Sequence, residues 1–153
     1  MIYTEMTKNA ANLIFEDCRD IMDSAGLPLI FRITSVANQM DTELETVVAL
    51  LSGMVEAVPS WRLLPKTALL ELLEEAGFPP EVGEAVWLLK PKPGVSHDEH
   101  LLAIAHSGNA AARHVKLVEV VDGYNEMGLR TTNNSDPVRE TYAQAANILR
   151  GAK

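Results

Sequence analysis

The feature that most constrains the fold is the spacing of apolar residues, which recur every three or four positions between glycine and proline stops. The clearest run follows Thr42, which together with Glu45 has the sequence pattern of a helix-capping box. Its apolar positions are Leu44, Val47, Val48, Leu51, Val55 and Val58. Because such steps place residues on one face of a helix, the pattern predicts a helix from residue 43 to about residue 58.

The same spacing predicts helices along the rest of the chain. Gly26 and Gly77 are expected to end two of them, and a proline stands at the start of several others. Ser96 and Glu99 form a second capping-box pattern. The expected helices cover about residues 8–24, 29–40, 65–76, 80–90, 96–106, 109–125 and 136–150. No segment shows a convincing strand alternation, so residues 1–153 are predicted to be a single all-α domain, a bundle of about seven or eight helices.

An acidic composition limits the partners that the chain is expected to bind. The 153 residues include 13 basic and 21 acidic side chains, for a net charge of -8. Such a surface repels phosphate backbones and anionic lipid, so neither nucleic acid nor a membrane is an expected partner. No signal-peptide pattern and no apolar stretch of membrane-spanning length occurs, which favours a cytoplasmic protein. The one cysteine, Cys18, is expected to be a small buried hydrophobic residue.

Two histidines three residues apart, His97 and His100, would share one face of the helix that Ser96 begins. They could hold a metal ion only with a third ligand, which the sequence does not identify. Asp98 and Glu99 suit the start of a helix because of its dipole, so an exposed helix start is the preferred interpretation. Glycine-rich phosphate loops, zinc-binding spacings and a serine-nucleophile elbow are absent from the sequence.

Five short motifs, taken in order, resemble those of a known enzyme family. They are Ala25–Phe31 (AGLPLIF), Val36-Ala37, Val47–Leu51 (VVALL), Gly77–Val82 (GFPPEV) and Ala112–Leu117 (ARHVKL). Together they resemble the small HD-domain metal-dependent phosphohydrolases, which include the guanosine tetra- and pentaphosphate hydrolases of the stringent response. The resemblance covers about residues 10–125 and implies an HD-like helical fold, followed here by a C-terminal helix over about residues 136–150.

The resemblance also implies that the catalytic positions of the family have been replaced. The matching positions are Arg32, Ser52, Gly53, Glu56, Ala57 and Glu119. Among them, Ser52 and Gly53 stand where the family has its metal-binding histidine–aspartate pair. Arg32 and Gly53 offer no lone pair to a metal ion, and Ser52 is a poor neutral ligand. Only Glu119 keeps ligand chemistry, and a single carboxylate does not hold a catalytic ion. Because no metal ion would be present to acidify a water molecule, neither catalytic residues nor a cofactor are expected.

Two interpretations of Arg32 remain open. In the first, Arg32 pairs with Glu119 or Glu56, and this ion pair replaces the metal ion as a link between helices in a closed pocket. In the second, Arg32 together with Lys116 and Arg19 still binds a phosphate group, since a planar guanidinium matches phosphate oxygens.

Three functions are compatible with these observations. The first is a catalytically inactive HD-like protein that binds a protein partner or a small phosphorylated ligand, such as a nucleotide, in a regulatory role. The second is an active nucleotide phosphohydrolase that uses Mn²⁺ or another divalent ion at a non-standard site, built from His97, His100 and Glu119. The third is a structural module that associates with itself as a homo-oligomer.

Overall fold

The computed structural model describes residues 2–130 and 137–151, with side chains described for residues 2–123 and 140–151. Within these residues the chain forms nine helices and no β-strand, which confirms the predicted all-α class. The helices group into two compact units, unit 1 (Met1–Lys90) and unit 2 (Pro91–Lys153). The predicted start of the last helix, at residue 136, lies outside the described residues.

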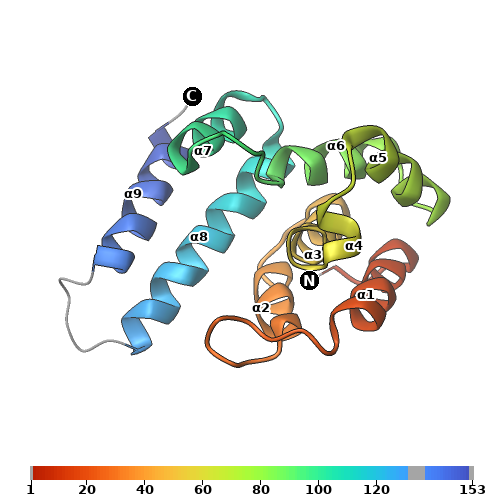
Figure 1. Ribbon diagram of the computed structural model, residues 1–153, viewed down its shortest axis with the longest axis horizontal. Coiled ribbons are helices and arrows are strands. Elements are labelled where there is room, and N and C mark those ends of the chain that lie inside the picture. Colours follow the sequence, from red (N-terminus) through yellow and green to blue (C-terminus); the bar gives the residue numbers. More distant parts are fainter. Residues whose placement is uncertain (1, 131–136, 152–153) are drawn as a thin grey trace. The chain divides into compact units, whose positions relative to one another are not determined.

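Unit 1 is built around one helix that is buried on nearly all sides. Its elements are α1 (Glu5–Cys18), α2 (Leu29–Ala37), α3 (Glu43–Ala57), α4 (Pro59–Arg62), α5 (Lys66–Glu75) and α6 (Pro80–Leu89). The central α3 contacts α1, α2, α4 and α6 (Figure 1). Its buried residues are Thr46, Val47, Val48, Ala49, Leu50, Leu51, Met54 and Val55. Each fully buried large apolar side chain stabilises the fold by about 1.5–3 kcal/mol, so α3 holds unit 1 together.

Helix α1 begins earlier than the apolar pattern predicts. The hydroxyl of Thr4 accepts a hydrogen bond from the Thr7 backbone N–H at 3.2 Å. In return, the Thr4 backbone N–H donates to the Thr7 hydroxyl at 2.8 Å. This reciprocal capping satisfies two N–H groups that would otherwise lack partners, and it starts the helix at Glu5. The pattern-based start at residue 8 missed it because Thr7 replaces the glutamate or glutamine of the usual motif.

Helix α1 also ends earlier than predicted, at Cys18 rather than at residue 24. The chain instead returns on itself, and Met22 and Pro28 form an isolated antiparallel β-bridge. Gly26 makes the turn with a φ of +82°, a left-handed conformation that glycine adopts without strain. The segment between α1 and α2 is therefore a closed turn.

The short helix α4 was not anticipated from the sequence, because four residues give no periodic pattern. It begins at Pro59, which stands at the first helical position. Its Trp61 indole N–H donates to the Asp17 carboxylate at 2.7 Å and so joins α4 to α1. The Lys90 ammonium donates to the Leu64 carbonyl at 2.9 Å, which links the residue after α6 to the segment after α4.

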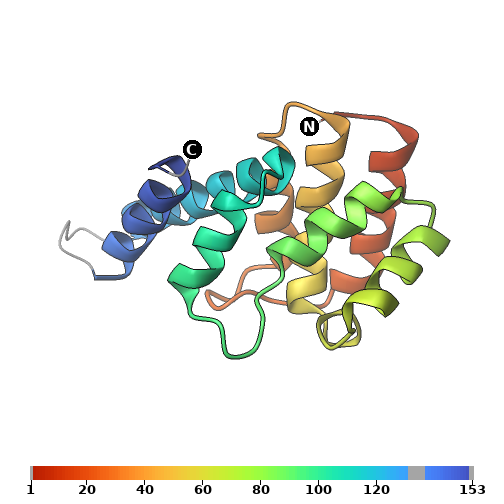
Figure 2. The ribbon, with the colours of Figure 1, turned by 90° about the horizontal axis from the view of Figure 1, so that it is seen from above.

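Unit 2 contains three helices: α7 (His97–His106), α8 (Ala110–Arg130) and α9 (Pro137–Gly151). Helices α8 and α9 run side by side in opposite directions, and α7 packs mainly on α9 (Figure 1 and Figure 2). The buried residues of this unit include Leu101, Ile104, Ala112, Val115, Ala145 and Leu149. As the capping pattern predicts, the Ser96 hydroxyl accepts from the Glu99 N–H at 3.1 Å. None of the described helices combines the length and apolar character that crossing a membrane requires.

Candidate functional site

The positions that the HD-like resemblance singles out lie in both units. Arg32 is on α2, and the other four positions of unit 1 are on α3. These four are Ser52, Gly53, Glu56 and Ala57. Since α2 and α3 pack directly on each other, the surroundings of Arg32, Ser52 and Gly53 within unit 1 follow from that unit alone. Glu119 and Lys116 lie on α8 in unit 2.

Gly53 is in close contact with Ile33 of α2. A Cβ atom at position 53 would lie 2.6 Å from Cγ1 and 3.0 Å from Cδ1 of Ile33. Ile33 is only 4% exposed, so it cannot move aside into solvent without disturbing the contact between the two helices. The space in which a side chain at position 53 would begin is therefore filled by a branched apolar group.

The neighbouring positions offer little metal-binding chemistry. Ser52 is half-buried, and its hydroxyl donates a long hydrogen bond of 3.4 Å to the Ala49 carbonyl of the same helix. Glu56 is exposed, whereas Arg32 is half-buried. Ala57 has no group that could bind a metal or activate water. The pairing of Arg32 with Glu56 or with Glu119 stays a prediction.

Lys116 and Glu119 form an ion pair on α8, with 3.1 Å between the ammonium nitrogen and a carboxylate oxygen. The two side chains are 8% and 30% exposed, so the pair is largely shielded from solvent. The predicted phosphate-binding cation Arg19 follows α1, is 65% exposed and lies 3.9 Å from the Asp20 carboxylate. Both cations thus have a carboxylate close by, which disfavours phosphate binding at either one.

His97 and His100 lie at the start of α7, as the sequence predicts. His97 is exposed, which agrees with an exposed helix start, but His100 is buried at 6% exposure. That expectation was wrong for His100, because the apolar side of a packed helix includes its first turn. The use of these histidines as metal ligands stays a prediction.

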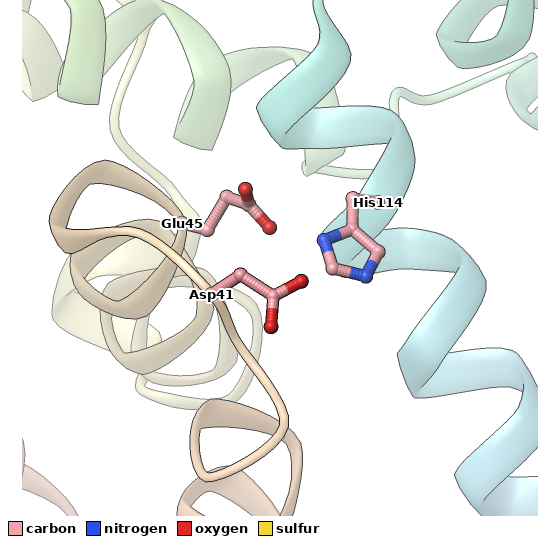
Figure 3. A group of neighbouring side chains, drawn as sticks. All are labelled: Asp41, Glu45 and His114. Carbon is pink, nitrogen blue, oxygen red and sulfur yellow. The ribbon is translucent and has the colours of Figure 1, made fainter. Parts of the chain in front are cut away.

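Three further side chains with metal-binding atoms are labelled in Figure 3. Asp41 precedes α3 and Glu45 is in its first turn, both in unit 1, whereas His114 is on α8 in unit 2. Glu45 has a structural role in its own unit, because its backbone N–H donates to the Thr42 hydroxyl at 3.1 Å. The predicted cap at the start of α3 is therefore present, and acidic residues at this end also interact favourably with the helix dipole.

Unit 2 contains a pocket of about 310 Å³ where α7 ends and α8 begins. Its lining combines the apolar side chains of Ala105, Ala110 and Leu117 with the basic side chains of Arg113 and His114. Sequence analysis missed this pocket. The feature of the sequence that could have indicated it is the helix break at Gly108, which is followed five residues later by the basic residue Arg113.

The reactivity of Cys18 follows from its surroundings. The residue is fully buried in unit 1, as expected, and burial together with the nearby Asp17 charge raises the pKa of its thiol to about 11. A thiol with such a pKa is protonated at neutral pH and is a poor nucleophile, so Cys18 has a packing role.

Searches against protein-family models and curated proteins returned no match to this chain. The resemblance to HD-domain proteins therefore rests on the order and spacing of the short motifs in the sequence. Functional conclusions depend on the side chains themselves and on what surrounds them.

Proposed function

We propose that this chain is a catalytically inactive HD-like protein that acts by binding a protein partner in a regulatory role. One observation carries the proposal, the contact of Ile33 with Gly53. The resemblance places a metal-binding aspartate at position 53, and an aspartate there would begin 2.6 Å from a buried side-chain carbon. The altered position is thus accommodated by the packing around it.

The remaining chemistry at these positions supports the same proposal. Metal-dependent phosphohydrolysis needs imidazole or carboxylate ligands and a water molecule that the ion makes acidic. Arg32 carries a positive charge at the position of a ligand, and Ser52 bonds within its own helix. Glu119 retains a carboxylate, but that carboxylate is paired with Lys116.

A protein partner is favoured over a phosphorylated ligand for two reasons. First, Lys116 is already neutralised within α8, and Arg19 is an exposed cation beside Asp20. Second, two apolar side chains near the β-bridge between α1 and α2 are largely exposed, Met22 at 57% and Phe31 at 62%. Exposed apolar groups that gather in one segment, here residues 22–31, favour a protein-binding surface.

The decisive experiment measures metal content and hydrolysis on the same purified protein. We expect less than stoichiometric manganese after dialysis, and no release of phosphate or pyrophosphate from a panel of guanine nucleotides with added Mn²⁺. Bound metal together with turnover would refute the proposal.

A thermal-shift assay with the same nucleotides separates a protein partner from a phosphorylated ligand. We expect no change in Tm that depends on Arg32. A rise in Tm that disappears in the Arg32→Ala variant would instead favour a ligand bound by the arginine at the altered position.

A further inference from the structure

The pocket of unit 2 contains a guanidinium group that the helix-end geometry holds in place. The Arg113 Nε–H donates to the Leu149 carbonyl at 2.9 Å, and its Nη2 donates to the Arg150 carbonyl at 3.4 Å. Both carbonyls lie in the last turn of α9, where main-chain oxygens have no partner within the helix. Arg113 thus joins α8 to the end of α9, and its guanidinium has a defined position.

These two carbonyls do not neutralise the charge of Arg113. The side chain is half-buried, and no carboxylate among the described residues pairs with it. A guanidinium has five N–H donors, of which the carbonyls of α9 engage only some. As far as the described side chains go, an acidic chain therefore keeps a positioned cation without a carboxylate partner at the wall of a pocket.

The rest of the pocket wall is mostly apolar. Ala105 comes from the end of α7, and Ala110 and Leu117 come from α8. His114, which projects from α8, adds a second basic group to the lining (Figure 3). A volume of about 310 Å³ is at the lower end of the range for small-molecule sites, where an apolar wall with a few polar groups is usual.

We propose that this pocket binds a small organic anion. The acidic group, a carboxylate or a phosphate monoester, is held by Arg113, and the apolar body contacts Ala110 and Leu117. An arginine with fixed geometry suits this task because its planar fork donates to two oxygens of one group at little cost in side-chain entropy. The inference goes beyond the proposed function, since it concerns a different part of the chain and does not depend on the loss of hydrolase activity.

The test is an NMR titration of the full ¹⁵N-labelled chain with four probes: benzoate, phenyl phosphate, neutral benzamide and inorganic phosphate. We expect one or both organic anions to shift the backbone signals of Gly108, Asn109 and Arg113 in a saturable way. Losing a hydrogen bond to a charged group reduces affinity roughly tenfold or more, so benzamide should bind at least that much more weakly. The tighter of the two organic anions identifies the acidic group.

Two variants examine the two halves of the proposed ligand. Arg113→Gln removes the charge, and Ala110→Leu fills the pocket from an exposed helical position while the Arg113 charge is kept. Both are expected to weaken binding of the organic anion roughly tenfold or more. Ala103→Leu, at an exposed position of α7 outside the pocket, is the matched control and should bind like the wild type. If the Arg113→Gln protein unfolds because α9 is no longer held in place, the affinity of the Ala110→Leu protein alone tests the proposal.

The inference is overturned if neither organic anion binds, if benzamide binds as tightly as the anions, or if Ala110→Leu leaves their affinity unchanged. Inorganic phosphate binding as tightly as phenyl phosphate would also overturn it, because the apolar wall would then contribute nothing. None of these results bears on metal content or hydrolysis, so failure here is distinct from failure of the proposed function.

Discussion

Replacing Gly53 by alanine changes the stability of the fold in two opposite ways, through helix preference and through the packing against Ile33. In an unhindered helix, alanine in place of glycine stabilises by about 1 kcal/mol. Here the added Cβ would lie 2.6 Å from Cγ1 of Ile33, so the side chain or α2 has to shift. Overpacking of this kind costs about 1–3 kcal/mol. The two terms together predict that Gly53→Ala lowers the free energy of unfolding by about 0–2 kcal/mol.

A double-mutant cycle with Ile33→Ala isolates this contact. Ile33→Ala removes both atoms that crowd position 53, and by itself it should cost about 2–5 kcal/mol because Ile33 is buried. In that background the added methyl group no longer clashes, so Gly53→Ala should stabilise by about 1 kcal/mol. The sign of its effect therefore reverses, and the coupling energy between the two positions is about 1–3 kcal/mol.

Urea unfolding followed by tryptophan fluorescence is a suitable assay, because Trp61 and Trp87 both lie in unit 1. Ser52→Ala, one position earlier on α3, is the control for helix preference and should change stability little in either background. Stabilisation by Gly53→Ala to the same extent in both backgrounds would refute the reasoning. It would show that position 53 has room for a side chain, and the argument that Ile33 closes it would fail.

Three other predictions concern interactions outside that contact. Asp17→Ala should lower the free energy of unfolding by about 1.5–3 kcal/mol in urea, because the Trp61 indole loses a charged acceptor at 2.7 Å. An unchanged urea midpoint of unfolding would contradict this prediction. Cys18 should resist thiol reagents at pH 8 until urea is added, because its pKa of about 11 exceeds the reference value of 9.0. The stabilisation that follows from this shift is complete below pH 9 and is lost as the pH rises through 11. Rapid labelling of the native protein would show instead that the thiol is accessible. Glu119→Gln should lower the free energy of unfolding by about 1–3 kcal/mol, because the buried Lys116 loses the carboxylate of its ion pair. The double change Glu119→Gln with Lys116→Met should lower it by less than the sum of the two single changes. Additive effects in thermal or urea unfolding would mean that the pair is not coupled.

Local sequence patterns predicted much of the secondary structure. The caps at Thr42 and Ser96 and most of the helical segments were predictable because they depend on residues within one helical turn of each other. The pattern failed where a different local interaction took over. Thr7 completes an unusual capping box, and α1 ends at Cys18, ahead of the turn that the β-bridge between Met22 and Pro28 closes.

The candidate site was predictable only in part. The motifs placed Ser52 and Gly53 on one helix, and the structure packs that helix against the one that carries Arg32. The pattern gave no indication of Ile33, because the distance from its side chain to Gly53 depends on how closely α2 approaches α3.

From the sequence came the prediction that this chain is helical and acidic, and the resemblance to HD-domain enzymes implies a lack of metal ligands at Arg32, Ser52 and Gly53. Those properties depend on residue type and on neighbours three or four positions away. Tertiary structure alone decided that Ile33 fills the space beside Gly53, and that Arg113 reaches the carbonyls at the end of α9. Both outcomes depend on how helices pack, which brings together side chains distant in sequence whose shapes and charges no short-range pattern encodes.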